Sequence, residues 1–164
     1  MTSRHPAGSA SAGIVVRPCA EADVDELVAR WHATNIAAYP YVAEQQRHTE
    51  DDARGYFTGT VLPTCRVFVA ERAGECAGLM ATEGCWIRHL AVFAAHRRHG
   101  VARALLEVAR AGSPHELRLF TFARNAPARA LYEAEGFVAV REGRSPSPED
   151  EPDVEYRWTP SLVR

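Results

Sequence analysis

The spacing of apolar residues along the chain separates stretches with helical periodicity from stretches that alternate in the manner of strands. Prolines and glycines mark the ends of these stretches, because proline stops a helix and glycine closes one. Four stretches predict helices: one from Val24 that ends before Tyr39-Pro40, one behind a capping box of Thr49 and Asp52, one from Val101 that Gly112 and Pro114 terminate, and one from about Ala126 to Glu135.

Seven shorter stretches are rich in β-branched and aromatic residues and predict strands. They are 14–17, 66–71, 76–82, 86–93, 117–122, 137–141 and 154–159. The segment from Glu142 to Asp153 is long for a hairpin connection and is rich in proline and acid. Strands and helices alternate along the chain in an order that indicates an α/β protein with a mixed sheet.

The length of 164 residues corresponds to one domain, since domains average roughly 150 residues. We expect this domain to span 14–164. Residues 1–13 are rich in Ser, Ala and Gly and lack the apolar core of a signal peptide. They are therefore interpreted as a flexible leader outside the fold.

The charge balance excludes several classes of function. The chain has 19 basic and 21 acidic residues, which argues against a dedicated nucleic-acid partner. All of the basic residues are arginine, so Schiff-base chemistry on lysine and a Walker A phosphate site are impossible. No apolar run reaches the ~18 residues that a membrane span needs, and we expect no membrane partner.

No two of the four cysteines form a Cys-x-x-Cys pair, which argues against a structural zinc site. Without a secretion signal they are expected to be reduced thiols in the cytoplasm. His96 and His99 are three residues apart, but Arg97 and Arg98 stand between them and repel a cation. We therefore expect no metal site.

Arg97-Arg98-His99-Gly100-Val101-Ala102 lies between a predicted strand and a predicted helix. A helix start offers unpaired N–H groups and the positive end of the helix dipole, which suits a phosphate or pyrophosphate. Gly100 and Ala102 leave room for the anion, and arginines add charged contacts. Taken alone, the stretch is equally compatible with a basic loop before an ordinary helix.

The chain carries two blocks, Leu90-Ala91-Val92 before Arg97-x-x-Gly100-x-Ala102, and a second one from Asn125 to Phe137. Together they resemble the GNAT superfamily of acyl-CoA-dependent N-acetyltransferases. The family has Gln/Arg-x-x-Gly-x-Gly/Ala after a strand with Leu-x-Val; this chain has Leu90-Ala91-Val92 followed by Arg97-x-x-Gly100-x-Ala102. The second block is Asn-x-x-Ala-x-x-Leu/Phe-Tyr-x-x-x-Gly-Phe. Its positions here are Asn125, Ala128, Leu131, Tyr132, Gly136 and Phe137.

The resemblance implies a fold and a set of cofactor contacts. The fold is a mixed, mainly antiparallel sheet of six to seven strands, flanked by about four helices and splayed between its fourth and fifth strands. Acetyl-CoA, as acyl donor, would enter the wedge, with the Leu90 N–H polarising the thioester carbonyl. The implied contacts are Leu90, Ala91 and Val92 for the pantetheine arm, Arg97, Arg98, His99, Gly100, Val101, Ala102 and Arg103 for the pyrophosphate, and Asn125 for the arm.

By the same resemblance, Tyr132 is the catalytic candidate, a phenol that gives its proton to the leaving thiolate. The alternative interpretation is an aromatic residue of a core helix face. The general base is open. Trp86 and Arg88 occupy the strand positions where some family members carry a base, so Glu83, His89 or a water chain remain, with water as the default.

The acceptor is expected to be a small-molecule amine or a peptide N-terminus. Trp86, Arg88, Tyr39 and Tyr41 are its expected contacts. Arg88 would suit a carboxylate, whereas the acidic segment 149–153 favours a cation; both together would fit a zwitterionic amine. The leading hypothesis is an N-acetyltransferase that works by direct attack of a primary amine. The alternative is a non-catalytic acyl-CoA sensor of the same fold, and a homodimer is possible by analogy.

Overall fold

The computed structural model describes residues 13–161, so the predicted leader at 1–13 lies outside the described residues except for Gly13. Seven strands form one sheet in the order β1-β2-β3-β4-β5-β7-β6. They are β1 (Ile14–Pro18), β2 (Arg66–Arg72), β3 (Glu75–Glu83), β4 (Trp86–Val92), β5 (Leu117–Phe122), β6 (Val138–Arg144) and β7 (Pro152–Trp158). All neighbours are antiparallel except β4 and β5, which confirms the mixed, mainly antiparallel sheet.

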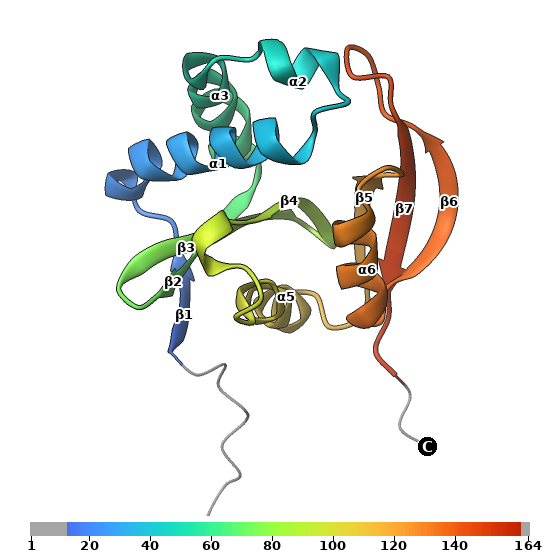
Figure 1. Ribbon diagram of the computed structural model, residues 1–164. Coiled ribbons are helices and arrows are strands. Elements are labelled where there is room, and N and C mark those ends of the chain that lie inside the picture. Colours follow the sequence, from blue (N-terminus) through green and yellow to red (C-terminus); the bar gives the residue numbers. More distant parts are fainter. Residues whose placement is uncertain (1–12, 162–164) are drawn as a thin grey trace, which may run out of the picture.

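Helices cover both faces of this sheet (Figure 1). They are α1 (Val24–Ala38), α2 (Ala43–Arg47), α3 (Glu50–Tyr56), α4 (Leu62–Thr64), α5 (Val101–Gly112) and α6 (Ala126–Ala134). The four longer helices match the four predicted from spacing. The sequence did not indicate α2 and α4, because helices of five and three residues are too short to show a periodicity. In the described part of the chain no helix is long and apolar enough to cross a membrane.

The predicted capping box of α3 is confirmed. The Thr49 hydroxyl accepts a hydrogen bond from the Asp52 N–H at 3.2 Å, and the Asp52 carboxylate accepts one from the Thr49 N–H at 2.8 Å. Both groups are otherwise left without an intrahelical partner at a helix start. A π-helical turn over Phe57–Val61 then leads into α4, so the helical rod is longer than the sequence pattern indicated.

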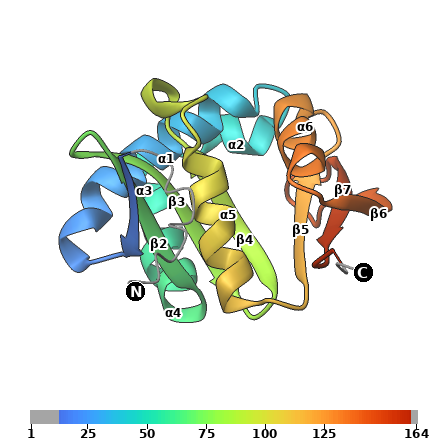
Figure 2. The same cartoon turned by 90° about the horizontal axis from the view of Figure 1, so that it is seen from below.

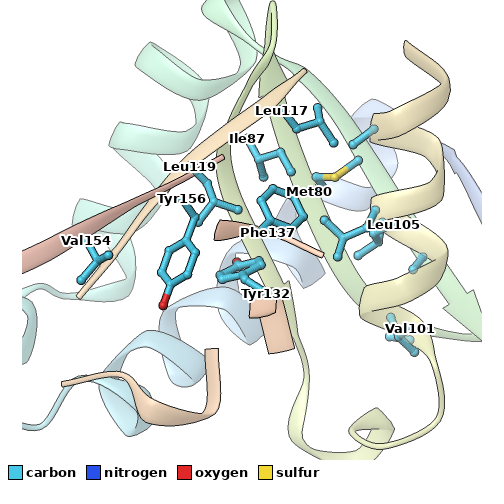
Figure 3. Close-up of a cluster of buried hydrophobic side chains, with 14 residues drawn as sticks. Met80, Ile87, Val101, Leu105, Leu117, Leu119, Tyr132, Phe137, Val154 and Tyr156 are labelled. Carbon is cyan, nitrogen blue, oxygen red and sulfur yellow. The ribbon is translucent and has the colours of Figure 1, made fainter. Parts of the chain in front are cut away.

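One part of the core lies between α5 and the sheet (Figure 3). Leu105 and Leu106 of α5 are fully buried against Met80 of β3 and Leu117 of β5. Burying side chains of this size contributes roughly 1.5–3 kcal/mol each. The apolar stripe of α5 therefore holds β3, β4 and β5 together from below.

The other part of the core lies under α1 and α3. Leu27, Val28 and Trp31 of α1 pack with Phe57 at the end of α3, against the opposite face of β2, β3 and β4. Trp31 is 6% exposed, and its ring contacts those of Phe57 and His89. Trp31 is therefore part of this core.

β4 and β5 meet at a single residue pair. Trp86 of β4 pairs with Arg118 of β5, whereas β5 and β7 pair along the whole of β5, from Leu117 to Phe122. Figure 2 shows the two strands close together at that end of β4 and apart at the other. The remaining length of β4 consequently has a strand partner only on the β3 side.

The connection between β6 and β7 is shorter than the sequence suggested. β6 continues to Arg144 and β7 begins at Pro152, with Gly143 paired to Asp153. The connecting loop is thus 145–151 rather than 142–153. Glu142, Gly143 and Arg144 have weak strand propensity, and their pairing to β7 decides their conformation.

A close backbone approach in the middle of β3 gives a test of this packing. A Cβ on Gly78 would lie 2.6 Å from the Ala91 carbonyl oxygen of β4, closer than real Cβ atoms come. Gly78→Ala is expected to lower the free energy of unfolding by about 1–3 kcal/mol. Urea denaturation measures the change.

Gly55 in α3 is the matched control, because a Cβ there meets no atom within 4 Å. Gly55→Ala is expected to leave stability unchanged or to raise it by up to ~1 kcal/mol through helix propensity. Equal effects of the two substitutions would contradict the close approach of β3 and β4.

Candidate functional site

Two hollows meet along β4. The α5 groove, of about 1010 Å³, is lined by the end of β4, the turn before α5, the start of α5, and α6. The β5 cavity, of about 690 Å³, is lined by β4, β5 and the β6–β7 hairpin. Six residues line both: Asn35, Tyr39, Leu90, Asn125, Ala128 and Tyr132. A molecule in the groove and a molecule in the cavity would therefore meet at these six residues.

The turn before α5 has the backbone geometry that an anion site requires. Arg98 and Gly100 both adopt left-handed conformations, with φ of 62° and 84°. Within residues 13–161, no side chain caps the first turn of α5, so its free N–H groups face the groove unpaired. These N–H groups and the helix dipole favour a negatively charged ligand.

Nearly all of the residues predicted to bind the cofactor line the α5 groove. Those that line it are Leu90, Ala91, Val92, Arg97, Arg98, Gly100, Val101, Ala102, Arg103 and Asn125. Arg97 donates from Nε to the Val92 carbonyl at 3.4 Å, and Arg103 pairs with Glu135 of the α6 C-terminus at 2.9 Å. His99 is the one predicted contact that does not line the groove.

His99 instead belongs to a cluster beneath the turn. The Arg72 guanidinium at the end of β2 lies 3.1 Å from Nδ1 of His99 and 3.4 Å from Nδ1 of His96, which is 3% exposed. Since guanidinium only donates, both Nδ1 atoms accept and both Nε2 atoms carry the proton. His96 Nε2 in turn faces the Glu75 carboxylate at 3.1 Å. Sequence reasoning missed Arg72, because nothing in the β2 pattern links it to a turn 25 residues away.

The free edge of β4 offers backbone donors to the groove. The Phe93 N–H donates to the Ala77 carbonyl on the β3 side at 2.9 Å. Backbone N–H groups alternate between the two edges of a strand, so those of Leu90 and Val92 point to the other edge, toward β5. With β5 paired only at Trp86, they are available to a ligand.

Tyr132 lies at the junction of the two hollows, on α6. Its side chain is 7% exposed and packs beside Phe137, with ring centroids 5.6 Å apart (Figure 3). Burial raises the pKa of its phenol well above the ordinary value, and the nearby Tyr39 raises it further. No residue of 13–161 forms a hydrogen bond with its hydroxyl. The phenol is therefore protonated near pH 7, and its O–H has no acceptor among these residues.

Asn125 caps the same helix. Its side-chain oxygen accepts from the Ala128 N–H at 3.3 Å, which leaves its amide N–H groups as donors at the junction. The cap fixes the start of α6, and Tyr132 follows two turns later. The second block of the sequence therefore builds one local structure, a capped helix that carries a buried phenol.

Aromatic rings form much of the β5 cavity and its surroundings. The Tyr39 ring packs edge-on to Phe122 at 5.0 Å, with Tyr41 next to both. Trp86 stacks on Phe120 at 5.3 Å. Of the four expected acceptor contacts, Tyr39 and Arg88 line the cavity, whereas Trp86 and Tyr41 support the rings that do.

Glu83 lies outside the lining of both hollows. Its carboxylate accepts from Arg88 Nε at 2.9 Å. The sequence predicts separate roles for these two residues, proton removal for Glu83 and binding of an acceptor carboxylate for Arg88. In the structure they bind each other instead. The pairing was not visible in the sequence, because it depends on the β-bulge that shifts the register between Ile87 and His89.

His89 lines the β5 cavity and is held by the helices above it. Its Nε2 lies 3.2 Å from the Tyr56 hydroxyl, and its ring packs against Trp31. Burial, with a smaller contribution from Arg88, lowers the pKa of His89 to about 4. The imidazole is therefore neutral near pH 7 and is a weak proton acceptor.

Carboxylates of the β6–β7 hairpin complete the β5 cavity. Glu142, Glu149 and Asp153 line it. Burial raises the pKa of both Glu149 and Asp153 above their ordinary values. The sequence predicts the acidic segment 149–153 but not which of its carboxylates face the cavity, since the hairpin register decides this.

Comparison with known proteins gives three findings. Residues 63–139 match the family model described as an acetyltransferase (GNAT) domain. No curated protein matches the chain. Solved structures share the fold across nearly the whole chain, at identities of 24% or less for the three described next.

The apo-form of YjaB from Escherichia coli has a TM-score of 0.75 at 24% identity, over 90% of this chain and 99% of that one. A GCN5-related N-acetyltransferase from Rhodopseudomonas palustris has a TM-score of 0.71 at 18% identity, over 94% and 100%. The putative acetyltransferase yncA from Salmonella typhimurium, solved with acetyl-CoA, has a TM-score of 0.67 at 15% identity, over 92% and 95%.

Substitution of Arg72 tests whether its contacts with His96 and His99 hold the turn before α5 in place. Arg72→Met removes the donor to His96 and His99 and is expected to weaken coenzyme A binding about 3- to 10-fold, as the turn loses its anchor. Isothermal titration calorimetry measures the affinity. Arg66→Met is the matched control: it removes the same charge from β2, at a residue whose guanidinium lies over the Phe68 ring. Equal affinity in all three proteins would rule out the anchoring role.

His89 gives a pH-dependent prediction. The unfolded chain binds a proton at His89 near pH 6.5, whereas the folded chain resists protonation until about pH 4. Stability is therefore lost as the pH falls through this window, on the order of 2 kcal/mol from this residue. His89→Gln should unfold with a shallower dependence between pH 6.5 and 4, measured by urea denaturation. The exposed His115→Gln is the control; an unchanged slope in His89→Gln would contradict the burial of a neutral imidazole.

Proposed function

Because residues 63–139 match the model of a GNAT acetyltransferase domain and solved structures share the fold, we propose that the chain is a GNAT acetyltransferase that transfers the acetyl group of acetyl-CoA to a primary amine. The observation that carries this proposal is the junction of the two hollows, where a buried phenol and the free edge of β4 face the same space. The α5 groove would take the acyl donor, and the β5 cavity the amine.

The donor side of the proposal rests on charge and backbone geometry. The uncapped start of α5, with Arg97, Arg98 and Arg103 around it, suits a pyrophosphate. The free edge of β4 suits the amides of a pantetheine arm, which would pair with it as an added strand. These two anchors would bring the thioester to Leu90, whose N–H is proposed to hydrogen-bond the carbonyl oxygen as it becomes negative.

The proposed step is direct attack without an enzyme-bound intermediate. The lone pair of a neutral amine forms the new C–N bond, the C–S bond breaks, and its electron pair goes to sulfur. Tyr132 donates a hydrogen bond, and finally its proton, to that sulfur, and regains a proton from solvent. Because burial raises the pKa of Tyr132, the phenol stays protonated until negative charge develops beside it.

The amine must lose one proton before attack and one after it. Glu83 is bound to Arg88, and His89 is a weak base. We propose that both protons leave through water in the β5 cavity. The cavity is lined by Glu149 and Asp153, whose raised pKa values make them stronger proton acceptors than ordinary carboxylates.

Two broader features belong to the same proposal. Residues 14–164 would act as one domain, since all strands of the described residues share one sheet. A cytoplasmic location is supported by the four cysteines, each of which is a free thiol.

Tyr132 tests the mechanism. Tyr132→Phe is expected to lower kcat about 10²- to 10⁴-fold, because the developing thiolate loses its donor. Release of the coenzyme A thiol from acetyl-CoA, in the presence of a panel of primary amines, measures the rate.

The affinity for acetyl-CoA is the internal control, since Phe preserves the packing of the ring against Phe137. Calorimetry should give nearly the same dissociation constant for both proteins. Undiminished turnover in Tyr132→Phe would remove the residue from the mechanism. A wild-type protein that binds acetyl-CoA but acetylates no amine would favour a sensor instead.

A further inference from the structure

Every arginine that lines the β5 cavity already has a carboxylate partner. Arg88 pairs with Glu83 at 2.9 Å, Arg141 with Glu155 at 3.3 Å, and Arg144 with Asp150 at 2.9 Å. None of these three partner carboxylates lines the cavity. The positive charge of the cavity wall is therefore compensated from outside the cavity.

The carboxylates that line the cavity are in the opposite situation. Glu142, Glu149 and Asp153 form no ion pair with any residue of 13–161. Glu142 and Glu149 are exposed and Asp153 is half-buried, and all three carboxylates face one cavity without an ion-pair partner among these residues. A ligand with positive charge would supply the missing partner.

The groups around Glu149 and Asp153 also favour a cationic ligand, because they raise the pKa of both carboxyl groups. Burial is the main cause that raises the pKa of Glu149. His48 opposes this shift, and the carboxylates of Asp153 and Glu44 add smaller effects that raise the pKa. Burial likewise raises the pKa of Asp153, against a partial effect of Arg141. A carboxylate in such a place is stabilised in its charged form when a cation binds next to it.

The acids and the reacting groups lie in different parts of the cavity lining. Tyr132 and Leu90 line both the cavity and the α5 groove, whereas the three acids line the cavity alone. Phe120, Phe122 and Tyr39 also line the cavity and give it aromatic walls. Tyr132, with a nearly fully buried ring and a hydroxyl that has no partner in the described chain, indicates that the cavity is built for a ligand at that end.

We propose that the acceptor is a diamine or polyamine, in which one amine reacts at Tyr132 and a second, charged amine is held by Glu149 and Asp153. The alkyl chain between the two nitrogens would pack on the aromatic walls. This inference rests on the proposed transfer of acetyl groups and narrows its acceptor. It replaces the zwitterionic amine considered from the sequence, because Arg88 is already paired with Glu83.

Three amines with the same five-carbon spacer test the proposal. They are 1,5-diaminopentane, hexylamine and 6-aminohexanoate, which end in an ammonium, a methyl and a carboxylate group. The value of kcat/KM is expected to be highest for the diamine, about 10-fold or more above hexylamine, and lowest for 6-aminohexanoate. Equal or better use of hexylamine or 6-aminohexanoate would overturn the proposal.

Two substitutions test whether the hairpin carboxylates cause the preference for the diamine. Glu149→Gln and Asp153→Asn should each raise KM for 1,5-diaminopentane and bring its kcat/KM closer to that of hexylamine, by about 3- to 10-fold. Glu21→Gln, at an exposed carboxylate before α1, removes the same charge and should keep the wild-type ratio. A ratio that changes equally in all three variants would mean a long-range charge effect and would contradict a site at the hairpin.

Binding measurements separate this proposal from the one it rests on. Calorimetry of each amine with the coenzyme A complex should show tighter binding of 1,5-diaminopentane than of hexylamine, and Glu149→Gln should reduce this difference. If no amine is acetylated but this pattern is found, the proposed acetyl transfer fails while the cation site stands. If amines are acetylated without any preference for the diamine, acetyl transfer stands and the cation site fails.

Discussion

A strand that has a neighbour on only one side leaves half of its backbone N–H and C=O groups without a protein partner. Most of β4 is in this situation, because β5 meets it only at Trp86 and Arg118. The strand is nevertheless in the middle of the sheet and is held firmly by α5 below and α1 above. Its free edge is consequently rigid and accessible at the same time, and both hollows are arranged around it.

The two layers of helices give the two hollows different chemistry. Below the free edge, the start of α5 and the left-handed turn before it provide unpaired N–H groups and arginines. Above it, α1, β5 and the β6–β7 hairpin provide rings and carboxylates. An anionic donor and a cationic acceptor would thus approach the same short segment of β4 from regions of opposite charge, with Tyr132 between them.

Much of this architecture could be predicted from the sequence, because it depends on local patterns. The capping box of Thr49 and Asp52, the helix behind Gly100, and the strand over 86–93 follow from nearby residues. The groove residues could also be predicted, since one continuous turn carries most of them.

What could not be predicted depends on contacts between distant segments. Arg72 reaches His99 only because β2 and the turn lie side by side in the fold. Arg88 meets Glu83 through a β-bulge, and Glu149 reaches the cavity through the register of the β6–β7 hairpin. Tertiary pairing decides all three, and no single stretch of the sequence records it.

The basic side chains that line the groove are all arginines, namely Arg97, Arg98, Arg103 and Arg124, and the printed sequence contains no lysine. Guanidinium stays protonated at any physiological pH and has no free lone pair with which to attack a thioester. A lysine in the same place would be exposed to its own reactive substrate at very high local concentration. Each chance acylation of such a side chain would erase a positive charge. An arginine-only groove is chemically inert toward the molecule that it is proposed to hold, and it keeps its charge through any number of turnovers.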